Sequence, residues 1–194
     1  MLTILSLSSV INDGFPFLFQ QVEASSVNPI SVLSQTAYMD RVGFFHIVGE
    51  VANMSNQTEN SVLITASVYD RSHVIMGTAS AYSDIGTLGP GERSAFHLLL
   101  TGVGQAGPIG TCQLSVSSQP AFGDQKPALL QLTVGRAYAD SLNNYHVVGE
   151  VTNEGNDTAN FVDVSAAFYN YNHQVIGEGT GYITAIPPKP DYAI

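Results

Sequence analysis

The chain has 194 residues, a formal net charge of −10 and only 11% charged residues. An acidic chain without a basic patch repels phosphate backbones, so nucleic acid is excluded as a partner class. No apolar run reaches the roughly 18 residues of a membrane-spanning helix, so we expect no transmembrane segment. Cys112 is the single cysteine, which excludes an intrachain disulfide and is typical of a small buried apolar residue.

The first segment, residues 1–28, contains two short apolar runs, Met1–Val10 and Phe15–Phe19, separated by Asn12-Asp13-Gly14. Two interpretations remain open. The segment resembles a degraded signal peptide, although no Lys or Arg precedes its apolar stretch as in a secretory leader. Alternatively, it supplies a closing or donated β-strand.

From Ala37 onward the chain repeats itself without gaps at an offset of one hundred residues. The segment Phe45–Asn53 returns as Tyr145–Asn153. Further residues that recur one hundred positions later are Ala37, Tyr38, Asp40, Asn56, Thr58, Asn60, Val62, Ala66, Tyr69, His73, Gly77 and Tyr82. A match this long indicates one structural unit used twice. We therefore expect repeat 1 at 29–120, a linker at 121–128 and repeat 2 at 129–194.

The repeated unit shows the alternation of β-strands. In Ser61–Tyr69 the even positions are apolar, and the same alternation returns in the second copy, so we expect the even side chains to face a core. Further strands are predicted at Ile30–Tyr38, Phe45–Asn53, Val74–Tyr82, Ala95–Thr101 and Cys112–Ser117. No segment has a helical period. Short, evenly spaced strands predict an all-β fold of two tandem immunoglobulin-like antiparallel sandwiches.

These residues resemble a known family. Phe45-x-Ile47-x-Gly49-x-Val51-x-Asn53, followed by Tyr69-Asp70, Ile75-x-Gly77 and Leu88-x-Pro90-Gly91, is similar to the FxLYD-type β-sandwich repeat of archaeal and bacterial proteins. The second copy departs from the pattern, with Asn170 in place of Asp70 and Pro187-Pro188-Lys189-Pro190 in place of the Pro-Gly turn. The resemblance implies the sandwich fold and a secreted or cell-surface setting, and it brings no catalytic residues.

The second unit is predicted to lack its last strands, because Ile194 corresponds to Ser94 of the first copy. Three interpretations stay open. The chain is a fragment of a longer repeat protein, or the second unit closes with fewer strands, or residues 1–28 fill the gap. In the third case we expect another molecule to be the easier donor, since residues 1–28 adjoin the first unit in sequence. Strand donation from chain to chain would build a filament.

Residues that could carry chemistry are few. His46 and Glu50 share a strand face but lie about 13 Å apart along it, which is too far for one metal ion. We predict no catalytic residues, no cofactor and no metal. Three Asn-x-Ser/Thr sequons begin at Asn53, Asn56 and Asn156. Asn56 and Asn156 occupy matching turns and are the preferred glycosylation candidates.

The leading hypothesis is a non-enzymatic secreted or cell-surface module with a structural or adhesive role. Its partners would be other copies of itself or other envelope proteins. One alternative is a self-assembling filament subunit closed by strand donation, and a further one is a metal- or carbohydrate-binding domain.

Overall fold

The computed structural model describes residues 5–6, 18–21, 28–122, 129–141 and 144–189. These residues contain no α-helix, and the predicted all-β fold is confirmed. The strands are β1 (Leu5–Ser6), β2 (Leu18–Gln21), β3 (Ile30–Met39), β4 (Phe45–Asn53), β5 (Glu59–Asp70), β6 (Ile75–Tyr82), β7 (Thr87–Leu88), β8 (Arg93–Leu100), β9 (Ile109–Pro120), β10 (Leu130–Ala139), β11 (Tyr145–Asn153), β12 (Ala159–Tyr169) and β13 (Val175–Ile186). A 3₁₀ turn, Val103–Gln105, lies between β8 and β9.

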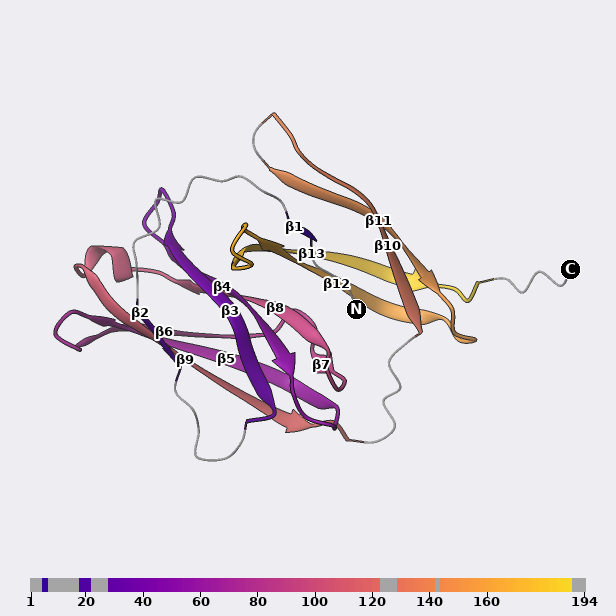
Figure 1. The fold of residues 1–194 in the computed structure, drawn as a ribbon, viewed down its shortest axis with the longest axis horizontal. Coiled ribbons are helices and arrows are strands. Elements are labelled where there is room, and N and C mark those ends of the chain that lie inside the picture. The colour runs from indigo at the N-terminus through magenta and orange to yellow at the C-terminus, as the bar shows by residue number, and fades with distance from the viewer. Residues whose placement is uncertain (1–4, 7–17, 22–27, 123–128, 142–143, 190–194) are drawn as a thin grey trace, which may run out of the picture.

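The first unit consists of two sheets packed face to face (Figure 1). One has the order β2-β9-β5-β6, with β7 also pairing with β5, and the other has the order β3-β4-β8. Buried apolar side chains from both sheets fill the space between them: Ile30, Ala37, Phe45, Ile47, Val51, Val62, Ile64, Ala66, Val68, Leu88, Phe96, Leu98, Leu100, Val103, Cys112 and Leu114. Removing this apolar surface from water is the main force that holds the unit together.

The alternation predicted for β5 is confirmed. Its even-numbered side chains Val62, Ile64, Ala66 and Val68 are each 0% exposed. Cys112 is also buried, as expected of a lone thiol, and burial raises its pKa to about 12. The thiol therefore acts as a core side chain.

Glycine in the Gly-x-Val-x-Asn motif is required by close backbone packing. A β-bulge interrupts the pairing of β3 with β4 between Val32 and Ser34. A Cβ on Gly49 would lie 2.6 Å from the Ser34 carbonyl oxygen and 2.4 Å from the Phe96 ring. Gly149 meets the Thr133 carbonyl in the same way, at 2.7 Å. Both copies therefore need a residue without a side chain at this position.

The asparagine that ends the motif organises the following turn. Asn53 is 0% exposed, and its Nδ2 donates hydrogen bonds to the carbonyl oxygens of Gln57 and Leu88 at 2.7 and 2.8 Å. Asn153 Nδ2 donates to Asp157 and Ile186 in the same manner. The bond to the Leu88 carbonyl is buried and the other three are partly buried, so leaving these carbonyl groups without a donor would be costly.

Two small sheets form the second unit. β10 pairs with β11, and β12 pairs with β13. Within the described residues this unit has no counterpart of β8 or β9. β12 also pairs with β1, in parallel, through Leu5↔Phe168 and Ser6↔Tyr169. β1 thus lies on the edge of β12 that corresponds to the place of β9 on β5.

The strand that pairs with β12 belongs to the same chain. The second unit folds back on the first, which brings β12 beside β1 (Figure 1). Donation of a strand by another molecule, which the sequence argument favoured as easier, stays a prediction. β2 of that segment pairs in parallel with β9. Most of residues 1–28, and linker residues 123–128, lie outside the described part of the chain.

Candidate functional site at the face between the units

The outer face of the β3-β4-β8 sheet is covered by the β12-β13 hairpin of the second unit. Val48 on this outer face is buried together with Tyr169 and Val175 from the hairpin. Two hydrogen bonds cross the contact. Ser165 Oγ donates to Asp84 Oδ2 at 2.7 Å, and the Val175 amide donates to Ser34 Oγ at 2.9 Å. The two units therefore form one continuous structure in the described residues.

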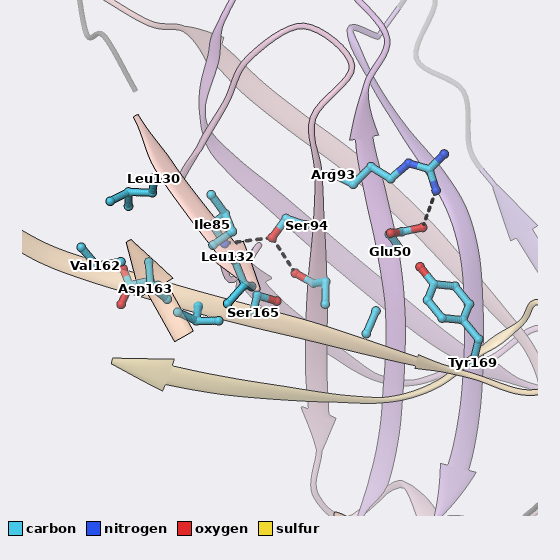
Figure 2. Close-up of a pocket in the computed structure, with 14 residues that line it drawn as sticks. Glu50, Ile85, Arg93, Ser94, Leu130, Leu132, Val162, Asp163, Ser165 and Tyr169 are labelled. Carbon is cyan, nitrogen blue, oxygen red and sulfur yellow. Dashed lines mark hydrogen bonds and ion pairs between the residues drawn. The ribbon is translucent and has the colours of Figure 1, made fainter. Parts of the chain in front are cut away.

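A cavity of about 280 Å³ lies beside this contact. Figure 2 shows Leu130 and Leu132 of β10 on one side of it and Val162 of β12 on another. Ile85 and Ser94 of the first unit complete the wall. One part of the wall comes from faces that form a closed core in the first unit, namely Leu130, Leu132 and Val162. The remainder, including Arg93, Ala167 and Tyr169, belongs to the contact between the units.

Charged and phenolic groups lie at one end of the cavity. Arg93 pairs with Glu50 at 3.4 Å, and the Glu50 side chain is only 8% exposed. The Tyr169 hydroxyl points toward Glu50 (Figure 2). Burial, and then the nearby Glu50 carboxylate, raise the pKa of Tyr169 well above its usual value. Tyr169 therefore stays a neutral phenol at physiological pH, so it is no base or nucleophile.

Asp84 is a second titratable group whose pKa is raised at the contact. Burial raises the pKa of Asp84 from 3.8 to about 6, and the charge of Glu178 acts in the same direction. The hydrogen bond from Ser165 opposes both effects.

A line of four polar side chains also crosses the contact. His46 Nε2 lies 3.2 Å from Asp40 Oδ2, and His46 Nδ1 lies 2.8 Å from His97 Nε2. His97 Nδ1 in turn lies 3.3 Å from Glu178 Oε1 of β13. The Tyr38 ring stacks on His46 with a centroid separation of 4.8 Å. We call these four groups, Asp40, His46, His97 and Glu178, the histidine bridge.

The other notable feature of the second unit is an open strand edge. β4 lies between β3 and β8, whereas β11 pairs only with β10 among the described strands. Val147 and Val148 are 36% and 46% exposed, while the equivalent Ile47 and Val48 are 0% and 2% exposed. An edge strand with exposed apolar side chains is a surface to which another strand can be added.

The sequon residues have different environments. Asn56 and Asn156 are exposed, so their side chains are available to a modifying enzyme. Both amide hydrogens of Asn53 are donated within the fold, so the folded protein offers no nitrogen there. The sequence preferred Asn56 to Asn53 because the Asn56 sequon recurs at Asn156, and the hydrogen bonds of Asn53 give a separate, structural reason for the same preference.

His46 and Glu50, which the sequence placed on one strand face, contact different side chains. Glu50 pairs with Arg93, whereas His46 contacts His97 and Asp40. The described residues contain no group of three His, Cys, Asp or Glu side chains arranged to hold a metal ion.

Sequence reasoning missed His97 and Glu178 as partners of His46, because both come from strands distant in the sequence. The repeat could have indicated the part of the bridge that lies close together in the sequence. Tyr38, Asp40 and His46 recur as Tyr138, Asp140 and His146, and that copy repeats the stack and the ion pair at 5.0 and 3.1 Å.

No protein-family model matches this chain, and no curated protein matches it. The described residues form no helix that is long and apolar enough to cross a membrane.

Proposed function

We propose that this protein is a non-enzymatic structural or adhesive module of a secreted or cell-surface protein, and that it binds partners by strand addition to β11. The observation that carries the proposal is the difference between two equivalent strands. β4 is covered by β8, while the matching edge of β11 has no described neighbour. The resemblance to FxLYD-type repeats supports the extracytoplasmic setting.

The first unit shows what a fitting partner looks like. β8 pairs antiparallel with β4 from Phe45↔Leu100 to Ala52↔Arg93. Its Phe96, Leu98 and Leu100 side chains enter the core. A partner of β11 would therefore be an extended segment with alternate apolar side chains, supplied by another copy or by another envelope protein. Backbone hydrogen bonds would give affinity, and the apolar side chains would enter the cavity of the second unit.

A synthetic peptide with the β8 sequence, residues 93–100, tests this proposal. We expect the peptide to bind the intact chain and to slow hydrogen exchange of β11 amides. Val147→Lys places a charge on the apolar side of the edge and should weaken binding at least tenfold. Thr133→Lys, on an exposed position of β10, is the matched control and should leave binding unchanged. Absence of binding by the peptide, or equal binding to the Val147→Lys variant, would disprove strand addition at β11.

The pairing of β1 with β12 favours a second candidate function, self-assembly by strand exchange. The two strands are separated by about 160 residues, and their contact consists of the two registered pairs Leu5↔Phe168 and Ser6↔Tyr169. The same contact made with a neighbouring copy would link chains head to tail, as in domain swapping.

Size-exclusion chromatography with light scattering tests this second candidate. We expect the full chain to form concentration-dependent oligomers and a variant without residues 1–28 to remain monomeric. A full chain that is monomeric at every concentration would exclude exchange. The β8-peptide experiment is independent of this result, since it uses the opposite sheet.

A further inference from the structure

We propose that the histidine bridge is a pH-dependent latch between the two units, which takes up one proton when the second unit docks on the first. Asp40, His46 and His97 belong to the first unit, and Glu178 belongs to β13 of the second. Docking therefore adds a carboxylate to an existing pair of imidazoles. The latch is independent of the strand-addition function.

Counting protons leads to this inference. The bridge has three polar contacts in series: Asp40 to His46, His46 to His97, and His97 to Glu178. Each contact needs one proton between its two heavy atoms, because carboxylate oxygens and unprotonated ring nitrogens only accept. Two neutral imidazoles carry two ring protons in total. If these two protons face Asp40 and Glu178, the contact between His46 Nδ1 and His97 Nε2 has no proton, and two lone pairs face each other. The complete bridge therefore requires a third ring proton.

The surroundings favour that third proton. Among the described residues, two acidic groups face the imidazole pair: Asp40 from the loop after β3 and Glu178 from β13. Asp84, from the loop after β6, acts on Glu178 through its charge. Tyr38 of β3 stacks on His46 and stays neutral, because burial and then the charges of Glu178 and Asp40 raise its pKa.

Partial burial alone would raise the pKa of Asp40. Hydrogen bonds from the Phe44 amide, from His46 and from the Val42 amide outweigh this effect and lower it. Asp40 thus remains a carboxylate that accepts from His46.

Because the bridge is partly buried, a contact that lacks its proton is energetically costly. The side chains of His46 and Glu178 are 15% and 19% exposed, so water offers limited compensation for an incomplete contact. The second unit contains the same local arrangement without the bridge. His146 pairs with Asp140 and stacks on Tyr138, but it is 44% exposed and no described strand lies on that edge of β11.

The sign of the pH dependence follows from linkage. The docked form binds one more proton than the separated form, so docking weakens as the pH rises through the range in which that proton is released. A difference of one proton corresponds to a change of up to tenfold in the docking constant for each pH unit.

Hydrogen exchange of the Val175 amide measures docking, because this amide donates to Ser34 Oγ across the contact. After correction for intrinsic exchange, we expect its protection to fall by up to tenfold per pH unit between pH 7.5 and 8.5. This window lies more than one pH unit above the Asp84 pKa of about 6, so Asp84 contributes little to the slope. In His97→Gln the glutamine donates to His46 without binding a proton, so the slope should disappear. His146→Gln is the matched control and should keep the slope of the unsubstituted chain.

A second measurement needs no variant. Nitrogen NMR of the histidine rings at pH 8 should show three N–H protons on the four ring nitrogens of His46 and His97, whereas two independent neutral imidazoles would carry two. Two ring protons at this pH would overturn the proposal. A pH slope for Val175 that is absent from the unsubstituted chain, or unchanged in His97→Gln, would overturn it as well.

Discussion

β4 and β11 have nearly the same sequence and lie in different surroundings. In the first unit β8 covers the outer edge of β4, the facing sheet covers its odd-numbered side chains, and the β12-β13 hairpin covers Val48. In the second unit the outer edge of β11 has no described neighbour, and residues 145–150 are all exposed. The comparison shows that the motif itself determines the local hydrogen bonds, whereas the neighbouring strands determine how far its side chains are buried.

Most local geometry is the same in both copies. The asparagine that holds the following turn and the histidine–aspartate pair recur with matching contacts. The β-bulge of the partner strand is displaced by two positions, because it lies between Val32 and Ser34 in β3 and between Val134 and Arg136 in β10. Burial is not the same, because it depends on the strands that happen to lie alongside. The four predictions below test this division, from the largest expected effect to the smallest.

The largest difference should come from core truncation. Ile64 is 0% exposed within a closed core, so Ile64→Ala should reduce the free energy of unfolding of the first unit by about 2–5 kcal/mol. The equivalent Val164 is only partly buried beside the cavity, and Val164→Ala should cost less than about 1 kcal/mol in the second unit. Native-state hydrogen exchange of β5 and β12 amides measures each unit separately. Equal losses in the two units would contradict the difference in burial.

The turn asparagines should behave alike in the two units. Asn53→Ala and Asn153→Ala each remove two donors from buried or partly buried carbonyl contacts, and each should cost about 2–3 kcal/mol. The same exchange experiment reports both losses. Asn156→Ala, at the exposed position directly after the turn glycine, is the control and should be almost neutral. A loss confined to one unit would show that the turn depends on its surroundings after all.

Asp84 should make the fold less stable at neutral pH. Its pKa is raised to about 6 in the folded protein, so the folded state binds more protons than the unfolded state between pH 3.8 and 6. This contribution favours folding at low pH and is lost as the pH rises through 6. Asp84→Asn, which can still accept from Ser165, should raise the urea midpoint at pH 7.5 more than at pH 4.5. A shift of equal size at both pH values would contradict the role of the charge.

The smallest effect is expected at Asp70. Asp70 Oδ1 accepts from the amides of Ser72 and Val74, and Asn170 Oδ1 accepts from Asn172 and Gln174 in the same geometry. Asp70→Asn should therefore change the unfolding free energy by less than about 0.5 kcal/mol, because the amide oxygen replaces the carboxylate. Asp70→Ala is the comparison and should cost about 1 kcal/mol more in a urea titration. A large loss in Asp70→Asn would show that the negative charge itself is needed.

Much of the first unit could be predicted from alternation alone. The bounds predicted for the strand Phe45–Asn53 agree with β4, and the even face of β5 is buried as expected. The repeat also identified the positions held by local geometry. His73 and His173, for example, recur because both occupy turns with left-handed backbone, at φ 60 and 58.

The contact between the units could not be predicted in this way. Val48 is an outward position by alternation and is nevertheless 2% exposed, because the hairpin of the second unit covers it. His97 and Glu178 come from strands that are far apart in the sequence, so no spacing indicates that they meet. The same limit applies to β1, whose partner strand could be identified only from the folded arrangement.

The parallel pairing of β2 with β9 has a mechanical consequence. Four consecutive residue pairs, from Leu18↔Thr111 to Gln21↔Leu114, join these strands. Tension applied between the start of β2 and the end of β9 would pull the two strands along their length in opposite directions. The hydrogen bonds would then bear the load together in shear rather than break one at a time. Such an arrangement is expected to resist traction along the chain better than one in which the hydrogen bonds break in sequence.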